Sequence, residues 1–181
     1  MSLYNIKIGS YQRSVFEIAK RHGWHETEMP WDSYIALAIV EICEAINADR
    51  VDHYCRQNLT DIDRLSDDEF KAFYEENVKD TVETEIADAV MYLLDYAYVR
   101  WGDNLNWDHY DVALPYKNGT FLNNAYVLIK QVLGILFPGV AEGVYFCYKW
   151  AEYLGFDLDA HIKCKMRFND LRPYRHGGKK Y

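Results

Sequence analysis

The chain reads YIALAIVEICEAIN over residues 34–47, and Glu41 and Glu44 are the only charged side chains in this stretch. It contains no Pro or Gly and is apolar nearly all round, so a helix formed here must be largely buried. A spacing of three residues puts both carboxylates on one face of that helix. The stretch therefore predicts a buried helix with an acidic pair on one side.

A second stretch, residues 85–95, repeats this arrangement with the sequence EIADAVMYLLD. Its polar side chains share one narrow stripe of a helix, because they follow one another at intervals of three, four and three residues. They are Glu85, Asp88, Tyr92 and Asp95. The chain thus contains two acidic motifs, E-x-x-E and E-x-x-D, on two largely apolar helices.

Proline and glycine are scarce in this chain, and they fall between long periodic segments. This punctuation separates helices rather than interrupting them. Strand signals are weak and no repeat or linker divides the chain, so we predict a single all-α domain over residues 1–181, built as a helical bundle. The expected helices cover residues 11–22, 33–49, 66–100 with a break near Asp80, 120–136, 140–154 and 157–171.

The acidic segment 49–80 lies between two expected core helices, so we interpret it as a surface insertion. Within it, Ser66 and Glu69 form the capping-box pattern that begins a helix. Asp157 is the expected N-cap of the last long helix. Residues 172–181 are interpreted as a basic tail, with a flexible hinge at its His-Gly-Gly sequence.

The composition describes one soluble globular protein of 181 residues, 50% hydrophobic and 27% charged, with a net charge of −8. On folding, a chain of this length buries roughly 70% of the surface that its unfolded form exposes, so it needs neither disulfide bonds nor metal merely to fold. The four widely spaced cysteines fit reduced thiols. There is no apolar signal region or membrane-length run, so we expect a cytoplasmic protein. The acidic charge argues against a binder of nucleic-acid polymers.

The two acidic motifs have a physical consequence if they face each other. Two carboxylates about 4 Å apart repel by roughly 4 kcal/mol at an effective dielectric constant of about 20, so such a cluster needs protons or a cation. Oxygen ligands without His or Cys suit Mg²⁺ or Mn²⁺. A di-iron site would want Glu-x-x-His motifs, which both stretches lack. The other interpretation is that each stripe is the solvated face of an amphipathic helix.

The carboxyl-terminal residues 161–181 are strongly basic, with the sequence HIKCKMRFNDLRPYRHGGKKY. They contain seven Lys and Arg against one Asp, a net charge of +6. Lys165, Asn169 and Arg172 share one helical face, where Lys and Arg suit phosphate oxygens and Asn suits a sugar or base edge. A solvated basic tail or nonspecific attraction to RNA would also explain this charge.

Taken in order, these motifs resemble the all-α nucleoside triphosphate pyrophosphohydrolase superfamily, which contains the MazG-like proteins and the dimeric dUTPases. The resemblance comprises the E-x-x-E and E-x-x-D pairs and a final K-x-x-x-N-x-x-R-x-x-x-H-G pattern. Gln12 and the Gly23-Trp24 step before the first acidic helix are also similar. The resemblance implies a Mg²⁺-dependent enzyme that cleaves a nucleoside triphosphate to a monophosphate and pyrophosphate. It also implies a homodimer or homotetramer.

The resemblance assigns roles to the matching positions of this chain. The metal ligands and catalytic carboxylates would be Glu41, Glu44, Glu85 and Asp88. Tyr92 matches an aromatic position that touches the nucleotide in some relatives, and Lys165, Asn169 and Arg172 match a motif that contacts phosphate and sugar. Two departures stand out, namely the 40 residues between Glu44 and Glu85 and the helical region 120–154, which the smallest members lack. The choice of nucleotide is therefore not transferred.

Further candidates come from position in the chain. Trp24 and Trp31 frame the loop before the first acidic helix and are candidates for stacking on a base. His176 and Lys179 are candidates for contacting phosphate, and Asp95 for orienting a ligand. Two alternatives to an enzyme remain at this point. One is a regulatory bundle that binds a nucleotide without hydrolysing it, and the other is a metal-free helical interaction protein.

Overall fold

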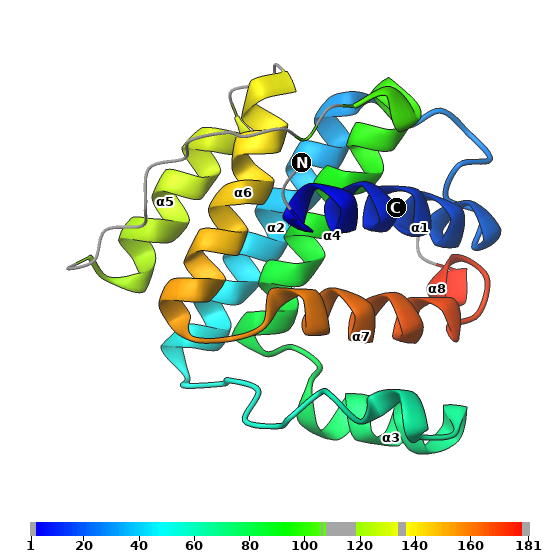
Figure 1. Ribbon diagram of the computed structural model, residues 1–181, viewed down its shortest axis with the longest axis vertical. Coiled ribbons are helices and arrows are strands. Elements are labelled where there is room, and N and C mark those ends of the chain that lie inside the picture. The colour runs from blue at the N-terminus through cyan, green and yellow to red at the C-terminus, as the bar shows by residue number, and fades with distance from the viewer. Residues whose placement is uncertain (1–2, 106, 108–118, 134–136, 179–181) are drawn as a thin grey trace.

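A computed structural model describes residues 3–105, 107, 119–133 and 137–178, and within these residues it is entirely helical (Figure 1). The all-α prediction is confirmed for this part of the chain, which has no β-strand. No described helix is long and apolar enough to cross a membrane. The elements are α1 (Leu3–Arg21), α2 (Trp31–Arg50), η1 (Ile62–Arg64), α3 (Asp67–Asn77), α4 (Val82–Trp101), η2 (Gly102–Asn104), α5 (Phe121–Val132), α6 (Phe137–Leu154), α7 (Leu158–Asp170) and α8 (Arg175–Gly178).

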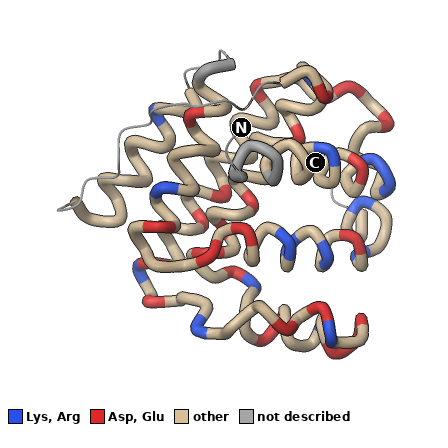
Figure 2. Tube along the Cα trace, viewed as in Figure 1, with Lys and Arg blue, Asp and Glu red and all other residues tan. Residues whose placement is uncertain are grey.

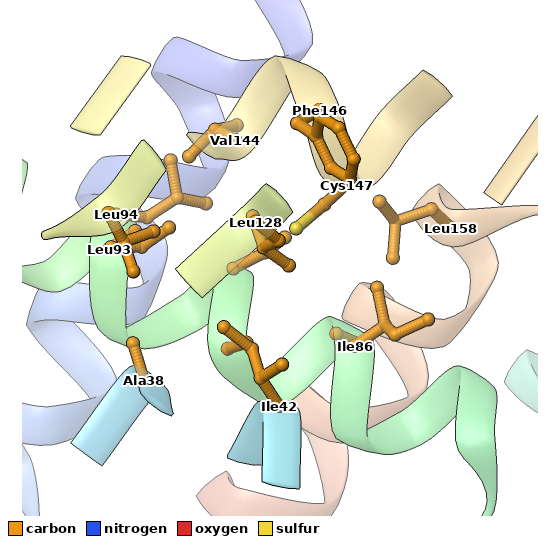
Figure 3. Close-up of a cluster of buried hydrophobic side chains, with 14 of the residues drawn as sticks. Ala38, Ile42, Ile86, Leu93, Leu94, Leu128, Val144, Phe146, Cys147 and Leu158 are labelled. Atoms are coloured by element: carbon orange, nitrogen blue, oxygen red, sulfur yellow. The ribbon is translucent and has the colours of Figure 1, made fainter. Parts of the chain in front are cut away.

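Four helices, α2, α4, α5 and α6, run side by side and share the main hydrophobic core (Figure 1). Ile42 of α2, Leu93 of α4, Leu128 of α5 and Cys147 of α6 point into it and are fully or almost fully buried (Figure 3). Helix α4 is the most central, because nearly every residue from Val82 to Ala97 is buried. The acidic residues of α4 therefore lie on the central, most buried helix of the described fold.

Helices α1 and α7 lie across the other side of α4 from the α5–α6 hairpin (Figure 1). The buried Gln12 of α1 attaches this layer to the end of α4. Its amide donates to the Gly102 carbonyl at 3.1 Å, and its side-chain oxygen accepts from the Trp107 indole at 2.8 Å. Gln12 thus satisfies its polar groups in the interior and positions α1 against α4.

The segment 49–80, expected as a surface insertion, packs on α7 with a small hydrophobic cluster of its own. Phe70, Tyr74 and Val78 are buried there together with Cys164 of α7. The Arg167 guanidinium of α7 donates to the carbonyl oxygens of Ile62 and Leu65 at 2.6 and 2.7 Å. The segment is therefore anchored to the helix that carries the basic motif.

The predicted helix boundaries have identifiable causes. Ser66 and Glu69 form the expected capping box at the start of α3. The expected break occurs at Asp80, whose positive φ of 58° ends the preceding turn, and α4 begins after Thr81. Asp157 caps α7 by accepting a hydrogen bond from the Ala160 amide at 3.2 Å.

The described part of the expected basic tail folds back onto the turn between α1 and α2 (Figure 1). The Arg175 amide donates to the His22 carbonyl at 3.0 Å, and the Tyr174 hydroxyl donates to Glu26 at 2.5 Å. Residues 175–178 form a left-handed turn, because all four have positive φ. This contact brings the first and the last of the sequence motifs, Gly23-Trp24 and His176-Gly177, into one region of the molecule.

Candidate functional site

A cavity of about 660 Å³ lies between α1, α2, α3, α4 and α7. Most of the candidate residues from the sequence line it, although they come from positions spread over most of the chain. They are Trp24, Glu41, Glu44, Glu85, Asp88, Tyr92, Lys165, Asn169, Arg172 and His176. The tertiary structure therefore brings the acidic motifs and the basic motif to one place.

Glu41 and Glu44 of α2 face Glu85 of α4, so the condition under which the acidic motifs would repel each other is met for these three residues. One carboxylate oxygen from each lies within 4.8 Å of the others, and we call these three residues the carboxylate triad. Burial raises the pKa of Glu41 well above its usual range, and the charge of Asp88 adds to this. Burial also raises the pKa of Glu85. The three carboxylates therefore repel one another when they are ionised, and bound protons or a cation would reduce this repulsion.

The fourth predicted ligand, Asp88, has a different partner in this structure. Its carboxylate accepts a hydrogen bond from the Lys165 ammonium of α7, and both side chains are largely buried. Burial by itself would lower the pKa of Lys165, but the Asp88 charge outweighs it and the net shift is upward. Lys165 is thus held in its charged form beside the triad.

Asn169 and Arg172 continue the basic side of the cavity. The side-chain oxygen of Asn169 is buried without a hydrogen-bond partner among the described residues, so it is an acceptor that lacks a donor. Arg172 is half-buried and lies over the Phe168 ring, with its guanidinium carbon 5.7 Å from the ring centroid. Burial lowers its pKa, although the charge of Asp88 opposes this shift. Figure 2 shows the basic residues along α7 and the segment after it.

The residues of the triad fit a hard divalent cation. Their donor set is all oxygen and comes from two helices that pack closely, which is the chemistry that Mg²⁺ and Mn²⁺ accept in proteins. No described His or Cys joins this group, so a softer metal is disfavoured.

The opposite end of the cavity is built around Asp95 and His25. Asp95 lies seven residues after Asp88 on α4, which is about 10 Å along the helix axis. Its carboxylate forms a hydrogen bond of 3.0 Å with His25 Nε2, and the Phe16 ring packs on the imidazole at a centroid distance of 4.6 Å. Apolar residues such as Met29 and Leu37 also line the cavity. This end is suited to a flat, partly polar group.

Sequence reasoning did not single out His25 because it lies in a turn, outside the periodic pattern that marks the acidic stripes. It also missed Tyr74 and Lys79, which line the cavity from the segment expected to be a surface insertion. No spacing rule relates these residues to α7, because only the fold of 49–80 places them there. The composition of this segment does not indicate a phosphate-binding role either, because the charged residues around Tyr74 and Lys79 are mostly acidic.

The aromatic and tail candidates differ in their placement. The rings of Trp24 and His176 pack edge to face with centroids 5.3 Å apart, so the amino-terminal turn and the chain end form one wall of the cavity. Trp31 is 44% exposed at the start of α2 and does not line the cavity, so the structure does not bring this candidate to the site. Lys179 lies outside the described residues.

Comparison of the chain with protein-family models, curated proteins and solved structures finds no match.

Proposed function

We propose that this protein is a Mg²⁺-dependent nucleoside triphosphate pyrophosphohydrolase. It would hydrolyse a deoxynucleoside or noncanonical nucleoside triphosphate to the monophosphate and pyrophosphate. One observation carries the proposal, namely that the carboxylate triad and the Lys165, Asn169 and Arg172 set line the same cavity. The resemblance of these ordered motifs to the all-α pyrophosphohydrolases supports the same activity.

The charges of the cavity favour a polyphosphate with metal over either one alone. When ionised, the triad repels phosphate and attracts a cation, whereas Lys165 and Arg172 attract phosphate. A metal–polyphosphate complex satisfies both sets, since Mg²⁺ binds carboxylates together with phosphate oxygens. The volume of the cavity, about 660 Å³, also lies within the usual range for small-molecule sites.

The residues have separate tasks in this hydrolysis. Glu41, Glu44 and Glu85 would hold Mg²⁺, which when bound neutralises phosphate charge and makes a coordinated water more acidic. Water forms a bond to the α-phosphorus, and a nearby carboxylate accepts its proton. The bond from that phosphorus to the bridging oxygen breaks, and its electron pair leaves with pyrophosphate. Lys165 and Arg172 stabilise the charge on the leaving group.

The end that contains Asp95, His25, Trp24 and Tyr92 would receive the base and sugar. Tyr92 and Trp24 supply aromatic surface, and the Asp95–His25 pair supplies polar groups held in one orientation. A buried polar pair discriminates between bases strongly, because a base that fails to hydrogen-bond leaves the pair unsatisfied.

A panel of ribonucleoside and deoxynucleoside triphosphates, including dUTP, tests the proposal. Each is incubated with the protein and Mg²⁺, and the monophosphate and pyrophosphate are measured. The control is the variant Glu41→Gln/Glu44→Gln, with its folding checked by circular dichroism. Pyrophosphate release above this control for at least one nucleotide is expected. Nucleotide binding without pyrophosphate release would instead indicate a regulatory bundle.

A further inference from the structure

Tyr74 of α3 is a buried residue with an unusual hydroxyl group. The side chain is 0% exposed, and its ring stacks on Phe168 of α7 with centroids 3.9 Å apart and planes 15° apart. The hydroxyl oxygen is buried, and no described residue meets it at hydrogen-bonding distance and angle. The Lys165 ammonium acts on this oxygen from nearby, but it can only donate, so the phenol O–H is left without an acceptor. Tyr74 also lines the cavity of the candidate site.

Leaving a buried hydroxyl unpaired is unfavourable, and a phenylalanine would provide the same ring without this cost. Other partly buried tyrosines in this protein show the usual solution. The Tyr54 hydroxyl donates to Asp49 at 2.5 Å, and the Tyr148 hydroxyl donates to Asp159 at 2.8 Å. Packing of the ring therefore does not explain why this residue is Tyr and not Phe. A ligand in the cavity that accepts a hydrogen bond from the hydroxyl would explain it.

The groups around Tyr74 indicate what kind of ligand this is. The Lys165 ammonium lies 5.9 Å from the centre of the Tyr74 ring, and the Lys165 and Asp88 charges both act on the phenol. The phenol in turn lies near enough to Arg172 to affect its pKa. Burial raises the pKa of Tyr74, so the hydroxyl stays protonated at neutral pH and can donate a hydrogen bond. A donor beside two cations suits an anionic oxygen.

We propose that the Tyr74 hydroxyl donates a hydrogen bond to a phosphate oxygen of the bound nucleotide. Segment 49–80 then supplies a substrate-binding residue of its own, in addition to covering α7. This inference rests on the proposed function, because it assigns a polyphosphate to the same cavity. It adds a residue that neither the acidic motifs nor the basic motif contains.

The inference has a second consequence for α3. This helix is attached to α7 through the small cluster around Phe70 and through a hydrogen bond from Arg167 to Asp67 at 3.0 Å. A hydrogen bond from Tyr74 to a phosphate would add a contact that exists only with ligand bound. Binding of pyrophosphate should therefore slow amide hydrogen exchange in residues 70–78 of the wild-type protein.

The variants Tyr74→Phe and Tyr54→Phe test this assignment as a matched pair, since each removes one hydroxyl and keeps the ring. Calorimetric titration measures the affinities for two ligands in the presence of Mg²⁺. They are inorganic pyrophosphate and the nucleoside triphosphate that the protein hydrolyses. Urea denaturation gives the free energy of unfolding. We expect Tyr74→Phe to weaken both affinities about tenfold while its unfolding free energy is unchanged or higher. Tyr54→Phe should keep wild-type affinity and lose stability.

Two results would overturn the role of Tyr74 alone. One is a Tyr74→Phe protein that binds and hydrolyses nucleotide as the wild type does. The other is a loss of affinity accompanied by a comparable loss of stability, because that pattern indicates a structural hydroxyl. A wild-type protein that binds neither pyrophosphate nor any nucleotide would overturn the proposed function as well. Hydrolysis by the wild-type protein therefore distinguishes an error about Tyr74 alone from an error about the proposed function.

Discussion

Lys165 of α7 donates a hydrogen bond to the Asp88 carboxylate of α4, and this contact joins the basic motif of the sequence to its second acidic motif. Both side chains are less than 15% exposed. A buried ion pair costs desolvation free energy, but removing one partner costs more because it leaves the other charge unpaired. The pair therefore holds α7 against α4 as well as placing a cation in the cavity.

We predict that Lys165→Met lowers the free energy of unfolding by about 3 kcal/mol, because it leaves Asp88 buried without its cation. The double variant Lys165→Met/Asp88→Asn should recover much of this loss, as measured by urea denaturation. The exposed pair of Arg13 and Asp103 is the control, and Arg13→Ala should leave the free energy of unfolding almost unchanged. Equal losses at the two sites would contradict this account.

The carboxylate triad predicts a specific response to metal. Above about pH 9, where Glu41 is ionised, Glu41→Gln/Glu44→Gln removes two charges of the repelling group, so the metal-free variant should be more stable than the wild type there by about 1 kcal/mol. Added Mg²⁺ should raise the melting temperature of the wild type and not that of the variant. Glu152→Gln, an exposed change on α6, should leave both responses unaltered. A Mg²⁺ shift that survives the double change would place the ion elsewhere.

The pKa values of the triad predict how stability varies with pH. Burial raises the pKa of Glu41 to about 9 and that of Glu85 to about 7. An acid whose pKa is higher in the folded protein favours folding at low pH and loses this contribution as pH rises through the raised value. Without metal, the melting temperature should therefore fall from about pH 5 to about pH 9.

Mg²⁺ competes with these protons, so the increase in melting temperature that it produces should grow over the same pH range. Calorimetric melting at several pH values, with and without Mg²⁺, measures both trends. Glu41→Gln should flatten them. A metal-free melting temperature that rises with pH in this range would show that the triad is not protonated as described.

The Asp95–His25 pair predicts selectivity for the base. Asp95→Asn keeps the shape of the side chain and changes its hydrogen bonding to His25, so the preferred tautomer of the imidazole changes. We expect the ratio of kcat/KM between the best and second-best nucleotides to fall about tenfold, mainly through KM. The comparison is Asp103→Asn, which lies on the surface. A uniform loss of kcat for all nucleotides would instead assign Asp95 to the phosphate end.

The turn at Gly23 predicts a link between the two chain ends. Gly23 has a φ of +82°, and a Cβ there would lie 2.3 Å from the Tyr174 ring. Gly23→Ala should cost about 1–2 kcal/mol and weaken nucleotide binding, because residues 174–176 would lose their docking surface. Gly9→Ala, where a Cβ meets no atom within 4 Å, should not destabilise the protein. Pulse proteolysis and nucleotide titration measure the two effects.

Much of the architecture follows from local patterns in the sequence. The capping box at Ser66, the left-handed residue at Asp80 and the apolar periodicity of α2 and α4 are local features, so most helix boundaries could be predicted closely. The predicted start of α1 was wrong, because this helix begins at Leu3, eight residues before the expected start at residue 11. The two acidic stripes could be recognised from their spacing, but whether they face each other could not, because packing sets the rotation of α2 against α4. The hypothesis of a solvated acidic face holds in part, since Glu44 is exposed while Glu85 is buried.

The partners of the site residues depend on contacts between distant segments. Asp88 meets Lys165 across 77 residues, and Asp95 meets His25 across 70. Trp31 was a reasonable candidate by its place in the sequence, but the first turn of α2 leaves it at the surface. Tyr74 enters the cavity only because segment 49–80 folds against α7.

The sequence by itself therefore determined the helices of this protein, the acidic stripes on two of them and the basic character of its end, since helical periodicity and capping act over a few residues. Only the tertiary structure decided which of these charges meet. Long-range packing fixes the register of one helix against another, and that register determines that three carboxylates gather together while the fourth binds a lysine.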